Sequence, residues 1–201
     1  MTKWLQENIQ LKGQKVKLIP LEKSHKAALL TAASDGALWE MWYTSVPSAT
    51  TIDTYIQRAL DQKKKGVELP FTVIDQANNE IIGTTRFYNI QPMHRRLEIG
   101  YTWYAKSSQR TGVNTECKYL LLQYAFEQLD CIAVQFMTNW YNMRSRKAIT
   151  RLGAKQDGVL RNHRLNADGS FRDTVVFSII AQEWSGVEKT LRYEMEKYPE
   201  V

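Results

Sequence analysis

The fold of this 201-residue chain is decided by residues 97–125, which read LEIGYTWYAKSSQRTGVNTECKYLLLQYA. The first eight residues alternate in polarity, which predicts a strand whose odd-numbered residues, up to Trp103, share one face. Glu98 then lies on the opposite face beside Gly100, a small residue that leaves room around the carboxylate. From Val113 the apolar residues recur every three or four positions, and this spacing predicts an amphipathic helix.

The polar loop that joins this strand to this helix, residues 105–112, is a candidate anion site. The first N–H groups of a helix have no partner within the helix, and the helix dipole adds a partial positive charge. A phosphate or pyrophosphate can therefore bind at the helix start. Gly112 would let the backbone approach such a ligand closely. The alternative interpretation is an ordinary strand-to-helix turn.

Composition restricts the class of protein. The chain has 27 Lys and Arg against 21 Asp and Glu, a net charge of 27 − 21 = +6, and a length typical of one domain. Cys117 and Cys131 are too few for a disulfide scaffold and lie in no CxxC pair, and the first residues contain no apolar signal segment. We therefore expect a soluble, cytoplasmic protein. We expect no bound metal either, because the three histidines lie on separate elements without ligand spacing.

Periodicity along the remaining chain predicts one mixed α/β (α+β) domain over residues 1–201. The predicted strands are at residues 15–21, 70–75, 81–87, 97–104, 133–138, 158–165 and 173–180. The predicted helices are at residues 22–33, 51–65, from 113, at 142–152 and, at the C-terminus, at about 187–198. We expect the seven or so strands to form a central, mostly antiparallel sheet flanked by helices.

Three segments together resemble a known family. Residues 109–112, QRTG, resemble the Q/R-x-x-G-x-G/A motif of the GNAT superfamily of acyl-CoA-dependent N-acetyltransferases. Residues 97–101, LEIGY, and residues 142–149, NMRSRKAI, resemble a strand and an N-x-x-S-x-x-A-I segment of its ribosomal-protein (RimJ/RimL-like) branch. Asn114 departs from the motif, which usually has a small residue there; its side chain would either crowd the pyrophosphate or cap the helix.

This resemblance implies a GNAT-like domain that transfers an acetyl group from acetyl-CoA to a primary amine, which attacks the thioester directly. The implied catalytic residues are Glu98, a base acting directly or through a water, and Ser145, a donor to the leaving sulfur. Glu98 is alternatively a solvated or ion-paired carboxylate, and Ser145 alternatively bonds its own helix. The implied acetyl-CoA contacts are Gln109, Arg110, Thr111, Gly112, Val113, Asn142 and Arg144. Asn142 is also a candidate helix N-cap, and Lys118 a further cation for the phosphates.

For the acceptor, the resemblance points to Trp39, Tyr43 and Phe87, with Trp42 and Tyr88 as further candidates, although aromatic residues more often belong to the core. The acceptor would be a small-molecule amine or a protein N-terminus. We expect neither nucleic acid nor a membrane as partner, and a homodimer stays open. Two other functions remain as alternatives: a non-catalytic acyl-CoA-binding module on the same fold and, because of the basic pI, a nucleic-acid-binding protein.

Overall fold

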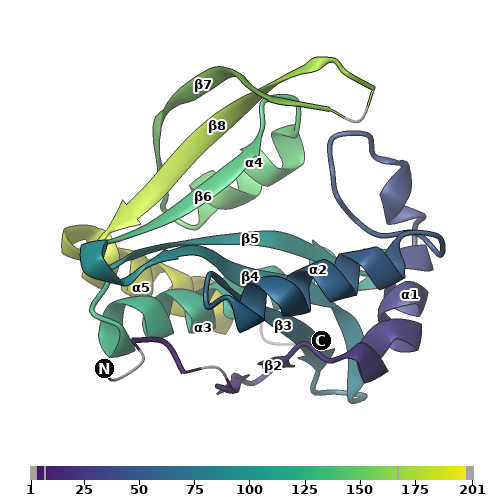
Figure 1. Cartoon of the computed structure of the whole chain (residues 1–201). Helices are drawn as coiled ribbons and strands as arrows, with labels where there is room; N and C mark the ends of the chain where they lie inside the picture. Colours follow the sequence, from purple (N-terminus) through teal and green to yellow (C-terminus); the bar gives the residue numbers. More distant parts are fainter. Residues whose placement is uncertain (1–3, 7, 167, 198–201) are drawn as a thin grey trace.

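The computed structural model describes residues 4–6, 8–166 and 168–197 (Figure 1). Within these residues eight strands form a single sheet in the order β1-β2-β3-β4-β5-β6-β8-β7. The strands are β1 (Leu11–Lys12), β2 (Val16–Pro20), β3 (Glu68–Asp75), β4 (Glu80–Gln91), β5 (Arg96–Tyr104), β6 (Ala133–Asn139), β7 (Lys155–Leu165) and β8 (Phe171–Ile180). Every neighbouring pair is antiparallel except β5 and β6. The mixed α/β class and the mostly antiparallel sheet are thus confirmed, with the two-residue β1 in addition.

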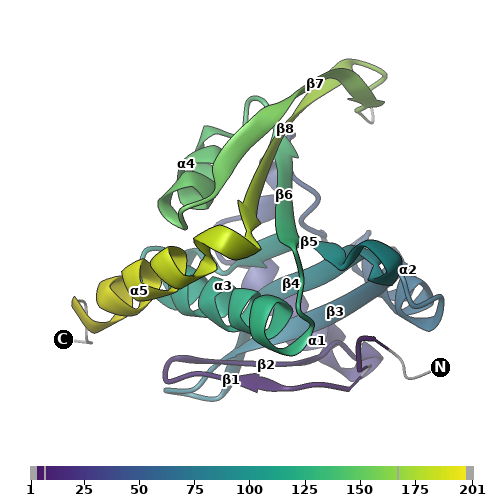
Figure 2. The same cartoon turned by 90° about the vertical axis from the view of Figure 1, so that its left-hand side faces the viewer.

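Helices cover both faces of this sheet (Figures 1 and 2). They are α1 (Lys26–Ser34), α2 (Ile52–Lys64), α3 (Val113–Gln123), α4 (Met143–Arg151) and α5 (Ala181–Lys197). One apolar cluster joins the sheet to α3, α4 and α5, and a second joins the opposite face to α1 and α2. Among the described residues, no helix combines the length and apolar character that crossing a bilayer requires.

The C-terminal helix starts earlier than the spacing of its apolar residues predicts. It follows β8 directly at Ala181, because Glu183 Oε2 accepts a hydrogen bond from the N–H of Ile180 at 3.3 Å and Trp184 packs into the core. Its last predicted residue, 198, lies outside the described residues.

A β-bulge in β5 changes which residues face each core. Arg86 of β4 pairs with Gly100, but Thr84 pairs with Trp103, so two residues of β5 oppose one residue of β4. Tyr101 lies in the bulge with a left-handed φ of 51°. The extra residue reverses the alternation: Trp103 packs in the α1–α2 cluster and not with Leu97. The expectation that Trp103 shares a face with Leu97 is therefore wrong.

The two central strands separate soon after they begin. β5 and β6 pair only at residues 96–98 and 133–135 among the described residues, and beyond these the two halves of the sheet diverge (Figures 1 and 2). The half with β6, β8, β7 and α4 stands away from the half with β1–β5 (Figure 1). This divergence places the end of β5 and the start of α3 opposite β6 and α4.

Candidate active site

The loop from β5 to α3 has the geometry of an anion site. Gly112 is the N-cap of α3, with φ at 87°, a conformation that favours glycine. No side chain caps this helix start within the described residues, so its first N–H groups can donate to a ligand. Asn114 is the second residue of the helix and does not cap it, so the capping alternative for Asn114 is wrong.

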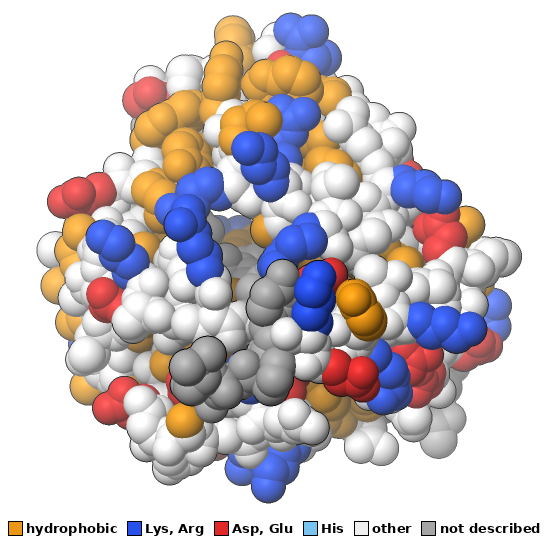
Figure 3. All heavy atoms as spheres, turned by 180° about the vertical axis from the view of Figure 1, so that it is seen from behind, with side chains coloured by type: hydrophobic (Ala, Val, Ile, Leu, Met, Phe, Trp, Pro, Cys, Tyr) orange, Lys and Arg blue, Asp and Glu red, His pale blue; other side chains and the backbone are white. Residues whose placement is uncertain are grey.

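Gln109 and Arg144 connect the two sides of the divergence. Gln109 Nε2 donates to the carbonyl oxygen of Tyr104 at 3.0 Å, which fixes the loop to the end of β5. From α4, Arg144 Nη2 donates to Gln109 Oε1. The guanidinium is therefore held beside the loop that opens α3. Seen from behind, Lys and Arg side chains also border a hollow near the middle of the molecule (Figure 3).

Asn142 and Ser145 form the start of α4. Asn142 Oδ1 accepts a hydrogen bond from the N–H of Ser145 at 3.0 Å, which makes Asn142 the N-cap of this helix. This confirms the capping interpretation of Asn142. The Ser145 hydroxyl makes no hydrogen bond within the described part of the chain and is half-buried, so it can donate to a group in the cleft.

Glu98 is the buried carboxylate of the candidate site. Its side chain is 3% exposed, and Oε1 accepts a hydrogen bond from Asn89 Nδ2 at 2.6 Å. Oε2 is buried without a hydrogen-bond partner among the described residues. A buried carboxylate oxygen that lacks a partner loses solvation without compensation, so it indicates a place for a ligand or a water. The expectation that Glu98 is a solvated strand carboxylate is wrong.

Two tyrosines lie beside this carboxylate. Tyr88 pairs with Glu98 across β4 and β5, and its ring crosses Gly100 so closely that a Cβ there would lie 2.6 Å from Cε1. Its ring also makes an edge contact with Tyr101 at 5.2 Å between centroids. Burial raises the pKa of the Tyr88 hydroxyl far above its usual value, and the charge of Glu98 adds to the shift. Tyr88 therefore stays a neutral hydroxyl beside Glu98.

Known proteins resemble this chain in sequence and in fold. A family model described as "Acetyltransferase (GNAT) domain" matches residues 15–155. The chain belongs to the GNAT acetyltransferase family. The resemblance seen in the sequence is confirmed, and acetyl transfer from acetyl-CoA to an amine is confirmed at the level of this family.

Relatives support the ribosomal-protein branch. "Putative ribosomal N-acetyltransferase YdaF" of Bacillus subtilis is 31% identical over 109 residues, 54% of this chain and 58% of that protein. "[Ribosomal protein uS5]-alanine N-acetyltransferase" of Escherichia coli is 24% identical over 127 residues, 61% of this chain and 62% of that protein. These alignments thus span about three fifths of each relative. A solved GCN5-related N-acetyltransferase from Brucella melitensis is 27% identical, with coverage of 94% of this chain and 86% of that one and a TM-score of 0.85.

Within this GNAT domain, Lys118 is not placed to bind phosphate. It is 5% exposed, and Nζ donates to Thr85 Oγ1 at 3.1 Å and to Thr102 Oγ1 at 2.5 Å, on the sheet beneath α3. Burial lowers the pKa of Lys118 to about 8. The expectation that Lys118 offsets phosphate charge is wrong, because its side chain points inward from a face of α3 that the sheet covers.

The acceptor side of this GNAT domain differs from expectation at Phe87. Phe87 is fully buried, and its ring packs against Phe71 and Tyr124, so it is a core residue and its predicted role in acceptor binding is wrong. The next residue, Tyr88, points to the opposite face because side chains alternate along a strand. That face carries Glu98. The sequence therefore pointed to the correct strand, β4, but to its core-facing residue Phe87 and not to Tyr88.

The other predicted acceptor residues belong to the segment between α1 and α2. Trp39 is half-buried against the α1–α2 cluster. Tyr43 makes an edge contact with Trp42 at 5.6 Å, and Trp42, which is exposed, approaches Tyr141 before α4 at 5.7 Å between centroids. This segment therefore reaches across to the α4 side. A binding role for Trp39 and Tyr43 stays a prediction.

Arg86 is a buried cation that contacts the bulge residue Tyr101. Arg86 Nη1 donates to Glu68 Oε2 at 2.9 Å, and the guanidinium lies between the rings of Tyr55 and Tyr101, 4.6 and 4.4 Å from their centroids. Arg86 is 2% exposed and Glu68 is 9% exposed. This stack fixes the Tyr101 ring. It could not be predicted from the sequence, because its four residues lie on β4, β3, α2 and β5.

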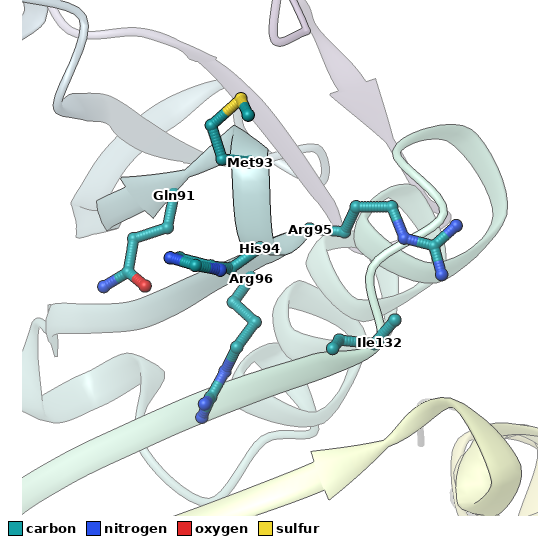
Figure 4. Close-up of a pocket in the computed structure, with 6 residues that line it drawn as sticks. All are labelled: Gln91, Met93, His94, Arg95, Arg96 and Ile132. Atoms are coloured by element: carbon teal, nitrogen blue, oxygen red, sulfur yellow. The ribbon is translucent and has the colours of Figure 1, made fainter.

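A pocket of about 610 Å³ lies at the other end of β5, near the β4–β5 turn (Figure 4). It is lined by Gln91, Met93, His94, Arg95, Arg96 and Ile132. Arg95 points away from Gln91 and His94 in the close-up and pairs with Asp130 (Figure 4). This pocket is remote from the α3 start. The described residues also contain no group of three or more potential metal-ligating side chains.

Proposed function

We propose that this protein transfers the acetyl group of acetyl-CoA to a primary amine where β5 and β6 diverge. The single observation that carries the proposal is a buried carboxylate oxygen, Glu98 Oε2, that has no hydrogen-bond partner among the described residues and lies on the strand that leads into the α3 anion site. A proton acceptor and a phosphate site on one strand–loop–helix unit are the two components that this reaction needs.

Acetyl-CoA fits the residues present. The uncapped start of α3 and the left-handed backbone at Gly112 can receive a pyrophosphate, and Arg144 adds a positive charge beside the loop. Gln109 positions this loop, and Arg110, Thr111 and Val113 contribute backbone around the helix start. Bound acetyl-CoA supplies the thioester carbonyl. The Asn142 oxygen is already engaged as the N-cap, which leaves its amide N–H groups for a contact with the pantetheine arm.

The chain's own groups move the protons. A lysine-like amine has a pKa near 10.4 and a peptide α-amine one near 8, so either kind must lose a proton before its nitrogen can attack near neutral pH. In our proposal Glu98 Oε2 accepts that proton, directly or through a water, and the neutral nitrogen attacks the thioester carbon. As the C–N bond forms and the C–S bond breaks, Ser145 Oγ–H donates its proton to the departing sulfur. The second proton lost by the nitrogen restores the Ser145 hydroxyl, so the products are an amide and a neutral thiol. Asn89 holds Glu98 in place through its 2.6 Å hydrogen bond.

The names of the relatives suggest an acceptor of the ribosomal-protein kind, so a protein N-terminus belongs to the proposal beside a small-molecule amine. Action in the cytoplasm, a homodimeric state and the absence of nucleic-acid binding stay predictions.

Glu98→Gln tests the proposal directly. Thiol release from acetyl-CoA would be followed with a panel of amines from pH 6 to 10, and product mass would confirm the added acetyl group. We expect kcat to fall by about 10²–10⁴-fold and to depend more steeply on pH, because without the base only the amine that is already deprotonated can attack. Glu80→Gln, an exposed carboxylate on β4, is the matched control. Unchanged turnover in Glu98→Gln would remove the base role, and acetyl-CoA binding without turnover for any amine would indicate a binding module.

A further inference from the structure

Two arginines of the β7–β8 hairpin face each other, and neither has an acidic partner among the described residues. Arg164 and Arg172 are paired in register across the two strands. Like charges directly opposite each other destabilise a strand pair. Within the described residues neither side chain forms an ion pair, whereas Arg161 on the same strand binds Asp173 through Nε and Oδ2 at 2.6 Å. We call Arg164 and Arg172 the arginine pair.

The carboxylate next to Arg172 in the sequence, Asp173, is already engaged elsewhere. Asp173 Oδ1 accepts a hydrogen bond from the N–H of Asn162 at 2.7 Å, and Oδ2 is the atom bound to Arg161. Arg172 is half-buried, and its Nε is buried without a hydrogen-bond partner among the described residues. A desolvated guanidinium N–H that lacks an acceptor is costly, so its presence points to an acceptor atom that a ligand supplies.

The arginine pair borders the face that carries Glu98. The positive charge of Arg164 acts on Tyr88, whose pKa it lowers against the larger upward effects of burial and Glu98. Arg172 interacts with both Tyr88 and Tyr101, and its own pKa is lowered by burial and by Arg164. Tyr88, which pairs with Glu98 across β4 and β5, is therefore close to both arginines as well, and Tyr101 is close to Arg172. The part of this face near Glu98 suits an amine, and the part near the arginine pair suits an anion.

We propose that the acceptor is a primary amine that also carries a carboxylate, with the amine directed to Glu98 and the carboxylate bound by Arg164 and Arg172. This rests on the proposed acetyl transfer and specifies the class of acceptor. Arginine is suited to this role because its planar guanidinium can bind both carboxylate oxygens at once. The carboxylate comes either from the α-carboxyl group of a free amino acid or from an acidic side chain close to a peptide N-terminus.

The test compares acceptors that differ only in this charge. The peptides Ala-Asp-Ala-Ala, Ala-Asn-Ala-Ala and Ala-Lys-Ala-Ala, all with an amidated C-terminus, would be assayed by thiol release, together with free alanine and alaninamide. We expect kcat/KM at least tenfold higher for one carboxylate-bearing acceptor than for its neutral counterpart. A preference within the peptides identifies a side-chain carboxylate, and a preference for alanine over alaninamide identifies an α-carboxylate.

Variants connect the preference to the arginine pair. Arg172→Gln should reduce the preference to below threefold, mainly through KM, and Arg172→Glu should favour the Lys peptide. Arg172→Lys should keep part of the preference for the acidic acceptor. Arg161→Gln, which removes an exposed arginine of the same hairpin, is the matched control and should keep the wild-type preference. Thermal unfolding of each variant identifies loss of folding.

The outcomes separate the two claims. Equal kcat/KM for acidic, neutral and cationic acceptors would overturn this inference while acetyl transfer stands. A fall of equal size for all acceptors in a folded Arg172→Gln would overturn it as well, because the residue would then serve the structure alone. Acetyl-CoA binding without turnover for any acceptor would overturn the proposed function, and this inference with it.

Discussion

Asn89 Nδ2 donates a 2.6 Å hydrogen bond to Glu98 Oε1, and Asn89 Oδ1 accepts one from Gln91 Nε2 at 3.0 Å. The buried carboxylate is thus connected, residue by residue, to the pocket at the β4–β5 turn, which Gln91 lines. Asn89 has a left-handed φ of 45°, which asparagine tolerates better than most residues. Both its backbone and its amide therefore suit it to hold one carboxylate oxygen and leave the other open.

Replacement of Asn89 should slow turnover without unfolding the protein. Asn89→Gly keeps the left-handed backbone and removes only the amide, so Glu98 loses its fixed orientation. We expect kcat to fall about tenfold, equivalent to ~1.4 kcal/mol, and the pH profile to shift, measured by thiol release across pH. Asn78→Gly, in the exposed β3–β4 turn, is the control. A wild-type pH profile in Asn89→Gly would mean that the carboxylate does not need this bond.

Lys118→Met should stabilise the protein at neutral pH. The folded pKa of Lys118 is about 8, below the ordinary value of 10.5, so the unfolded chain binds the proton more tightly. The folded state therefore carries a penalty that is complete below about pH 8 and disappears as the pH rises towards 10.5. A difference of this size corresponds to ~3 kcal/mol.

Urea unfolding of wild type and Lys118→Met at pH 7 and pH 10 measures this effect. We expect the variant to be more stable at pH 7 and the difference to shrink at pH 10. The hydroxyls of Thr85 and Thr102 lie 2.8 Å apart and can bond each other after the change. Lys147→Met, on the exposed surface of α4, should show no such pH dependence. A difference that is constant with pH would indicate packing and not titration.

Gly112→Ala should weaken both acetyl-CoA binding and the fold. The nearest atom to an added Cβ is Lys15 Cε at 3.7 Å, an ordinary contact, so the cost comes from the left-handed backbone and amounts to ~1–2 kcal/mol. The methyl group also stands where a phosphate would approach, so we expect Kd for CoA, by calorimetry, to rise roughly tenfold. Gly186→Ala in α5, with open space around its Cβ, should raise stability by ~1 kcal/mol and leave Kd unchanged.

Arg144→Ala should reduce both the affinity for CoA and its dependence on salt. The change removes a cation beside the α3 start and the bond that Arg144 makes with Gln109. We expect Kd to rise by roughly five- to tenfold, about 1 kcal/mol, and to vary less between 50 and 500 mM NaCl. Arg151→Ala, at the exposed end of α4, removes the same charge farther from the loop. Equal effects of the two changes would mean that Arg144 acts only through the overall positive charge of the protein and not through its place beside the loop.

The sequence predicts the elements well because their signals are local. Alternation identifies β5, the three-and-four spacing identifies α3, and Gly112 marks the helix start that the structure shows. The faces of β5 could not be predicted beyond Gly100, because a bulge depends on pairing with β4 and leaves no mark on alternation. Trp103 is the residue for which this matters most.

The part of the candidate site that lies on β5 and on the loop after it could be predicted from the sequence. Glu98 follows from its strand position and from family resemblance, but its bond with Asn89 depends on a turn between two strands. Lys118 is misleading because a lysine on an amphipathic helix usually faces solvent, and here two threonine hydroxyls compensate its burial in part. The proposed role of Arg172 could not be predicted from the residues around it in the sequence. That role depends on Arg164 on the opposite strand and on Tyr88 in the other half of the sheet.

The short pairing of β5 with β6 gives this sheet two edges in its interior. Beyond residues 98 and 135, among the described residues, the two strands no longer pair with each other, so the N–H and C=O groups on their facing sides are not bonded across this pair. An extended molecule with amide groups of its own can bond to such an edge as an additional strand would. An edge of this kind otherwise invites pairing with another chain. The short pairing of β5 with β6 thus leaves backbone groups that an extended ligand can bond.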